Sequence, residues 1–154
     1  MTRTRVGKVV LAAGLFAACL SSAAQAAGPF QFHAISPCRL ADTRSGFGGA
    51  LSGGTPRNFT ARGVCGIPAG AAAVVVNVTV VGPSQTGFLT LYPSDLGSPP
   101  LVATLTFNAG EPALGNGAIV PLAASGTPDL TAVYGIGGGS ATTHVVLDTT
   151  GYFQ

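Results

Sequence analysis

The stretch A-A-A-V-V-V-N-V-T-V-V, residues 71–81, determines how the rest of the chain must be arranged. It is uncharged and rich in valine, and turn-forming residues bound it at 68–70 and 82–84. Stiff β-branched side chains pack well on a pleated sheet, so this run predicts a strand. Alternation separates two faces, one with Val74, Val76, Val78 and Val80, the other with Val75, Asn77, Thr79 and Val81. Because both faces are largely apolar, we expect a central strand covered on both sides, with Asn77 as a hydrogen-bonded amide in the core.

Short apolar runs separated by Gly and Pro continue along the chain, and helix signals are nearly absent. Further strands are predicted at residues 30–38, 57–64, 87–92, 101–107, 118–122, 130–134 and 143–149, with a last hydrophobic element at 151–153. In residues 101–107, alternation predicts that Leu101, Ala103, Leu105 and Phe107 face inward. The sum is an all-β fold: a single antiparallel β-sandwich, jelly-roll-like, of seven to nine strands over residues 27–154.

The N-terminus predicts a signal peptide at residues 1–26. Arg3, Arg5 and Lys8 precede an apolar segment at 9–20, and the segment 24–26 has the small-x-small pattern of a cleavage site after Ala26. The apolar segment is too short to span a bilayer, and no second one follows, so no transmembrane segment is predicted in the mature chain. We therefore expect a secreted or cell-surface protein. The alternative is lipidation at Cys19, which small residues precede.

Removal of this segment changes both the charge and the cysteine count. Three of the seven basic residues leave with it, so four arginines face five acidic residues, and nucleic-acid binding is not expected. Cys38 and Cys65 remain as an even pair in an exported chain, which predicts a disulfide. The chain-entropy estimate for the loop it closes is about 3 to 4 kcal/mol. The alternative is a pair of buried free thiols.

Several motifs occur in an order that resembles a bacterial secreted module found in actinobacterial, acidobacterial and planctomycete proteins, alone or attached to hydrolases and adhesive domains. The chain starts this pattern with P-C-R-L-A-D-T-R at 37–44 and ends it with D-T-T-G-Y-F at 148–153. Between them lie G-V-C-G-I-P at 63–68, V-N-V-T at 76–79, G-F-L-T-L-Y-P at 87–93, T-F-N-A-G at 106–110 and N-G-A-I-V-P at 116–121. The resemblance covers nearly the whole mature chain and implies a β-sandwich accessory domain.

All four arginines lie within the segment that the predicted disulfide closes. Guanidinium groups gathered in this way suit recognition of carboxylate, sulfate or phosphate, with Arg57 and Arg62 as candidate ligand-binding residues. We expect instead that Arg39 and Arg44 pair with Asp42 or Asp148 and tie the first strand to the last. Such a network would be structural.

Catalysis is not expected, and neither is a metal or another cofactor. A serine hydrolase signature is absent from the sequence, and a phosphate-binding G-x-x-x-x-G-K cannot form because no lysine follows Lys8. His144 and Asp148 are four residues apart on a predicted strand, about 13 Å at about 3.3 Å per residue, so one metal ion cannot bind both. The five acidic residues are isolated from one another.

The expected function is therefore a non-catalytic secreted or cell-surface module that binds a glycan or another envelope component. Variable loops on a rigid frame suit recognition, and Tyr92 and Tyr134 are the candidate aromatic contacts, since the chain has no Trp. Asn77, Asn108 and Asn116 are expected to be structural amides rather than sugar ligands. The alternative is a structural protein that associates with itself, because low charge leaves few groups to keep exposed faces apart.

Overall fold

The computed structural model describes residues 29–136 and 140–154. The predicted signal peptide, its cleavage site after Ala26, and Cys19 lie outside the described residues. The strands are β1 (Phe32–Asp42), β2 (Leu51–Ser52), β3 (Arg57–Phe59), β4 (Ala73–Val81), β5 (Gly87–Pro93), β6 (Leu105–Phe107), β7 (Ala113–Pro121), β8 (Leu130–Ile136) and β9 (Thr142–Phe153). A three-residue 3₁₀ turn, η1 (Ser94–Leu96), follows β5.

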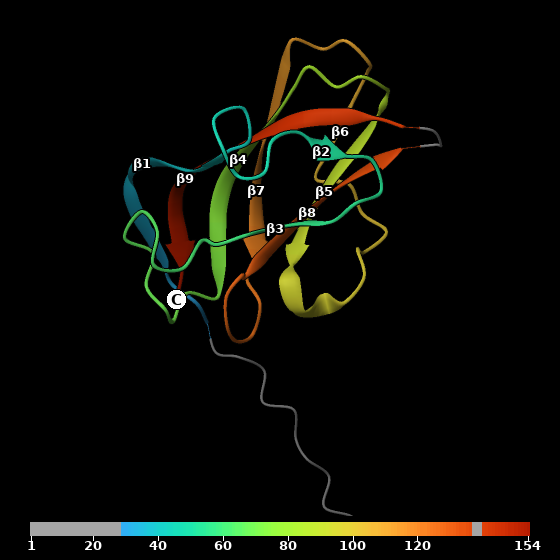
Figure 1. The fold of residues 1–154 in the computed structure, drawn as a ribbon. Coiled ribbons are helices and arrows are strands. Elements are labelled where there is room, and N and C mark those ends of the chain that lie inside the picture. The colour runs from blue at the N-terminus through green and yellow to red at the C-terminus, as the bar shows by residue number, and fades with distance from the viewer. Residues whose placement is uncertain (1–28, 137–139) are drawn as a thin grey trace, which may run out of the picture.

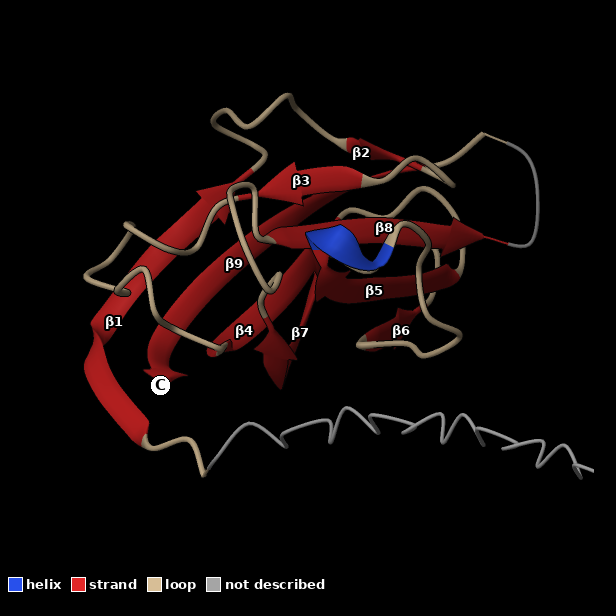
Figure 2. Cartoon of the chain, turned by 90° about the horizontal axis from the view of Figure 1, so that it is seen from below, coloured by secondary structure: helices blue, strands red, loops and turns tan. Residues whose placement is uncertain are grey.

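Two antiparallel sheets pack face to face, as predicted (Figures 1 and 2). One has the order β1-β9-β4-β7, with β2 also pairing β9, and the other has the order β3-β8-β5-β6. Apart from the short β2, the first strand pairs with the last, β3 with β8, β4 with β7, and β5 with β6. This nested pairing is that of a long hairpin rolled up into two sheets, which is the jelly-roll arrangement. The predicted fold class is confirmed.

The core lies between the sheets and is built from alternate residues of each. Strand β4 contributes Val74, Val76, Val78 and Val80, all at most 1% exposed. Leu89 and Leu91 of β5 and Tyr134 of β8 face them from the other sheet. Burying each such side chain stabilises the fold by about 1.5–3 kcal/mol relative to leaving it in water.

The other face of β4 corrects one prediction. The strand is central within its sheet, between β7 and β9, yet only one of its faces is covered. Asn77 is exposed and donates from Nδ2 to Thr79 Oγ1 at 3.3 Å, so it is not a core amide. Valine on a solvent-facing sheet surface is tolerated because β-branched residues favour the extended backbone as well as burial. Apolar content therefore overstated how deeply this strand lies.

Several predicted strand boundaries also differ, among them the start of β7, which lies at Ala113 rather than at residue 118. Strand β1 continues through Pro37 to Asp42 with two irregularities in its pairing, because proline is accepted on an edge strand. The strand predicted at 57–64 ends at Phe59, since the next backbone donors bond the side chain of Asp129. Of residues 101–107 only Leu105–Phe107 form a strand, and Leu101 and Ala103 are exposed rather than inward.

Candidate functional site

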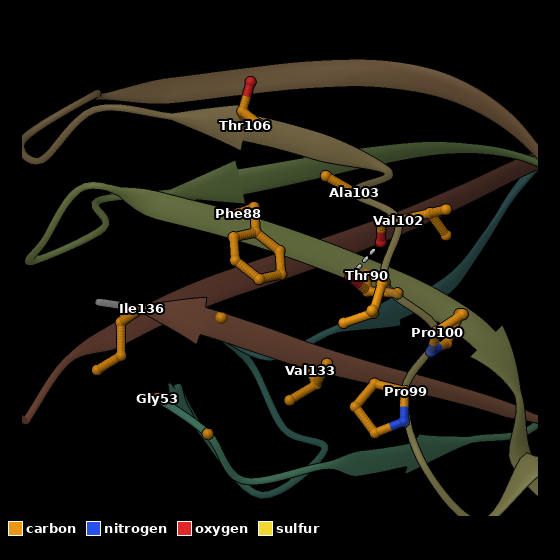
Figure 3. Close-up of a pocket in the computed structure, with 13 residues that line it drawn as sticks. Gly53, Phe88, Thr90, Pro99, Pro100, Val102, Ala103, Thr106, Val133 and Ile136 are labelled. Carbon is orange, nitrogen blue, oxygen red and sulfur yellow. Dashed lines mark hydrogen bonds between the residues drawn. The ribbon is translucent and has the colours of Figure 1, made fainter. Parts of the chain in front are cut away.

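A groove lies on the outer face of the β3-β8-β5-β6 sheet, and we call it the outer groove (Figure 3). Its floor is formed by residues that alternate with core positions: Phe88 and Thr90 of β5, and Val133 and Gly135 of β8. The segment Pro99–Ala103 forms one wall, and the turn at Gly53–Gly54 with Ile136 forms the other. Its volume is about 620 Å³.

Phe88 is the exposed aromatic residue of this groove. Its ring lies directly against Gly135 of the neighbouring strand: a Cβ atom at Gly135 would fall 2.1 Å from Phe88 Cζ. The ring is thereby held down on the sheet while 40% of the residue remains exposed. The glycine makes room for an aromatic surface in a fixed orientation.

The wall at Pro99–Ala103 is anchored to the sheet by hydrogen bonds that replace strand pairing. Thr90 Oγ1 donates to the carbonyl of Val102 at 2.6 Å, and the hydroxyl of Thr104 accepts from the backbone N–H of Leu91 at 2.9 Å. These bonds direct Leu101 and Val102 outward, where they are 105% and 63% exposed. The rim of the groove thus presents two aliphatic side chains to solvent.

The predicted tyrosine contacts are not in this groove. Tyr134 is fully buried in the core, where its hydroxyl donates to the carbonyl of Gln85, so it cannot stack on a ligand. Tyr92 is 4% exposed and lines a second hollow of about 520 Å³ between β5 and β7. Burial raises the pKa of both phenols above the ordinary value. For Tyr134, alternation could not reveal which face of β8 is covered, whereas Tyr92 shares the Phe88 face of β5 and is nonetheless buried.

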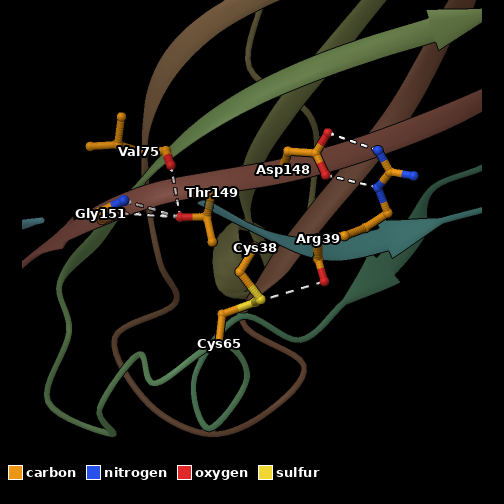
Figure 4. Close-up of a disulfide and its surroundings, with 7 residues drawn as sticks. All are labelled: Cys38, Arg39, Cys65, Val75, Asp148, Thr149 and Gly151. Atoms are coloured by element: carbon orange, nitrogen blue, oxygen red, sulfur yellow. Dashed lines mark hydrogen bonds and ion pairs between the residues drawn. A yellow bond between two sulfur atoms is a disulfide. The ribbon is translucent and has the colours of Figure 1, made fainter. Parts of the chain in front are cut away.

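The arginine cluster forms internal contacts. Arg39 and Asp148 are opposite each other on β1 and β9, and their side chains make a bidentate pair, Nε–Oδ1 at 2.8 Å and Nη2–Oδ2 at 3.1 Å (Figure 4). Arg44 holds Asp42 through Nε, Nη2 and its backbone N–H, at 2.7–3.0 Å. Arg39 Nη1 also reaches Asp42, at 3.1 Å. The expected tie between the first and last strands is present.

The hydrogen bonds from Arg44 hold the pKa of the Asp42 carboxyl well below its usual range, against a smaller opposing effect of desolvation. The Asp42 side chain is 10% exposed, whereas those of Arg39 and Arg44 are 51% and 48% exposed. Because the arginines are half in solvent, the pairs are screened and contribute less than fully buried ones.

The two candidate anion ligands, Arg57 and Arg62, bind the protein's own carbonyl groups. Arg57 donates to the carbonyls of residues 47, 49 and 50. Arg62 donates to the carbonyl of Ala71 at 2.7 and 3.0 Å, with Asp129 4.0 Å from its Nη1. Both guanidinium groups brace loops.

The disulfide joins Cys38 on β1 to Cys65 in the loop after β3, with a Cα–Cα distance of 5.8 Å (Figure 4). The prediction of this bridge is confirmed. Cys65 has a positive φ of 56° beside Gly66, which turns the loop back under β1. The bridge fixes the edge strand against the arginine-braced loop.

The remaining predicted residues have structural or solvent-facing positions. Asn116 is exposed and donates to the carbonyl of Thr104 at 2.7 Å, and Asn108 is exposed. His144 Nδ1 lies 3.2 Å from Thr43 Oγ1, and His33 stacks on Tyr152. Within residues 29–136 and 140–154, no group of three His, Cys, Asp or Glu residues could hold a metal ion.

The sequence did not identify three features: Phe88 on the groove floor, the exposed side chain of Leu101 at the groove rim, and Asp129. Asp129 is fully buried and accepts the backbone N–H groups of Ala61 at 2.8 Å and Arg62 at 2.9 Å. An aspartate in a Gly- and Pro-rich segment looks like an ordinary turn residue. The contact partners are 67 and 68 residues away, so no local signal could have identified it.

No family model matches the chain, and no curated protein matches it. The described residues include no helix long and apolar enough to cross a bilayer. The resemblance to the bacterial secreted module stays a prediction.

Proposed function

We propose that this protein is a non-catalytic, exported binding module, and that the outer groove receives an apolar group of a cell-envelope component. The observation that supports this proposal is the groove itself. It has a volume of about 620 Å³ on a sheet, the ring of Phe88 is held in place in it, and aliphatic side chains line its rim. Sites for small ligands are typically apolar concavities of about 300–1,000 Å³. Export is supported by the signal-peptide pattern and by the disulfide.

The chemistry of the lining favours an apolar ligand over a sugar. Among the described residues of the groove, the polar side chains are those of Thr90 and Thr106, and the hydroxyl of Thr90 is already bonded to the chain. Sugar recognition needs several polar groups to replace the hydration of the hydroxyls. An acyl chain needs none. A glycan is the second candidate, because the exposed ring of Phe88 offers a stacking surface.

The absence of catalysis is proposed from the environments of the residues that could act. His144 faces Thr43, and His33 stacks on Tyr152. Asp42 and Asp148 are held by arginines, and the pKa of Asp42 is shifted away from the range useful to a base at neutral pH. These groups lie on β1 and β9, whereas the outer groove lies on the opposite sheet.

Calorimetric titration of the secreted protein with oleate and with soluble peptidoglycan fragments tests the proposal. We expect oleate to bind, and Leu101→Asp and Phe88→Asp each to weaken binding about tenfold or more, since each puts a charge where the bound ligand would make apolar contact. Phe32→Asp is the matched control for Phe88→Asp, because Phe32 is 51% exposed on β1 of the other sheet and its ring likewise lies against a glycine, Gly151.

Each outcome distinguishes the candidates. Binding of peptidoglycan fragments but not oleate, lost in Phe88→Asp, would favour the glycan. Binding of neither probe, or oleate binding that the groove variants leave unchanged, would contradict the assignment of the groove.

A further inference from the structure

The sandwich has four lateral edges, and three of them are protected against pairing with another strand. Strand β1 carries Pro37, two breaks in register and Arg39, and the disulfide at Cys38 crosses it. Strands β3 and β6 are only three residues long. Short length, proline, charge and bulges are the features by which sheet edges avoid association.

Strand β7 has none of these features along its length. Its nine residues pair with β4 in unbroken register, from Ala113 opposite Val81 to Pro121 opposite Ala73. The strand carries no charged residue, and its one proline is the last residue. No described strand pairs with its other edge. Alternate backbone N–H and C=O groups along that edge are therefore left to solvent or to another strand.

The neighbouring loop leaves this edge uncovered. Asn116 is on the inward-facing side of β7 and donates to the carbonyl of Thr104, in the loop just before β6. On the outward side, Gly115, Gly117 and Ile119 are exposed, Ile119 by 62%. The edge is uncharged and accessible.

We infer that β7 pairs antiparallel with β7 of a second copy of this chain, about a two-fold axis at Gly117. An element that pairs with itself antiparallel does so about a two-fold axis, which gives a closed dimer. With the two Gly117 residues opposite each other, Ile119 lies opposite Gly115 of the partner subunit. The large side chain of one copy thus meets the residue without a side chain on the other.

The composition of β7 suits pairing of its free edge with β7 of a second copy. The edge requires an extended, uncharged strand, and β7 is itself such a strand. No charge on either copy would oppose the approach, and the chain has no lysine after Lys8, the residue that most often blocks an edge. The dimer joins the two five-stranded sheets into one continuous sheet, and the outer groove of each copy lies on the other sheet.

Cysteine cross-linking tests the register. A Cβ atom at Gly117 meets nothing within 4 Å, so Gly117→Cys can fold as the wild type does. We expect Gly117→Cys to form a disulfide-linked dimer on a non-reducing gel, because each cysteine faces its own copy across the axis. Ala113→Cys, exposed at the end of the same strand, should stay monomeric on that gel because it faces the other end of the partner strand.

Light scattering after size exclusion tests the association itself, on the secreted protein with its disulfide intact. We expect a dimer that Gly117→Lys converts to monomer, since two lysines would lie directly opposite each other. Asn77→Lys is the matched control: Asn77 is exposed and opposite Gly117 in register, but one strand further in. Its two copies would be about 14 Å apart, three strand spacings, beyond the Debye length of about 8–10 Å.

A wild-type monomer at every concentration up to the solubility limit would overturn the inference. So would a dimer that persists in Gly117→Lys and that Gly117→Cys fails to cross-link. A melting curve of Gly117→Lys that matches the wild type at high dilution separates loss of pairing from loss of folding. Oleate binding should be unchanged in Gly117→Lys, so this inference and the proposed function fail independently.

Discussion

Replacing Asp129 by alanine should produce a large loss of stability for an acidic residue outside any ligand site. Its two carboxylate oxygens accept the backbone N–H groups of Ala61 and Arg62, and Ala61 is fully buried. Hydrogen bonds to a charged acceptor contribute about 1.5–3 kcal/mol each, and a buried donor without a partner adds its desolvation cost. We therefore expect Asp129→Ala to lower the free energy of unfolding by about 3–5 kcal/mol.

For a domain of about 125 residues this corresponds to a fall in melting temperature of about 10–20 °C. Calorimetry or thermal circular dichroism at neutral pH measures it. Asp95→Ala is the control: Asp95 Oδ2 also accepts one backbone N–H, from Ala124 at 2.8 Å, but in an exposed position, so its loss should stay within about 1 kcal/mol. Asp129→Asn should be intermediate, because the amide keeps one acceptor oxygen. Equal effects of Asp129→Ala and Asp95→Ala would refute the reasoning.

Two further predictions concern the first strand. Replacing Cys38 and Cys65 together by serine should lower the free energy of unfolding by about 3–4 kcal/mol, because the bridge closes a loop of 27 residues. Denaturant titration measures this loss, and an unchanged midpoint would contradict the prediction. Because the folded-state pKa of Asp42 is lowered, its contribution to stability is fully present above the unfolded-state value of about 4 and is lost as the pH falls further. The deficit of Asp42→Asn relative to wild type should therefore be constant near neutral pH and shrink below about pH 4, and a deficit independent of pH would contradict the role of the Arg44 pair.

The candidate site was less predictable than the fold because alternation assigns residues to faces without saying which face is buried. In β5, Leu89 and Leu91 share one face while Phe88, Thr90 and Tyr92 share the other, and both contain large side chains. Only the packing of β5 against the opposite sheet makes the Leu89 face the core and leaves Phe88 on the surface. Asn77 was expected in the core for a different reason: both faces of β4 are largely apolar, although only one of them is covered.

For the arginines too, some contacts could be predicted from the sequence and others could not. Their confinement to residues 39–62 was readable in the sequence, as was a pairing of Arg39 and Arg44 with few available carboxylates. That Arg57 and Arg62 bind backbone carbonyls was not, because carbonyl groups occur at every residue and only loop geometry brings particular ones within reach.

The class of fold and the disulfide could be predicted from the sequence, because strand propensity and turn residues act locally and an even cysteine pair is a matter of count. The tertiary structure alone decided which valines of β4 are buried, that Asp129 holds a loop 67 residues away, and that β7 is an open edge while β1 is protected. Each of these depends on which strand lies beside or above which. That choice is made by long-range packing of whole sheets, whose energy is not contained in any single stretch of the chain.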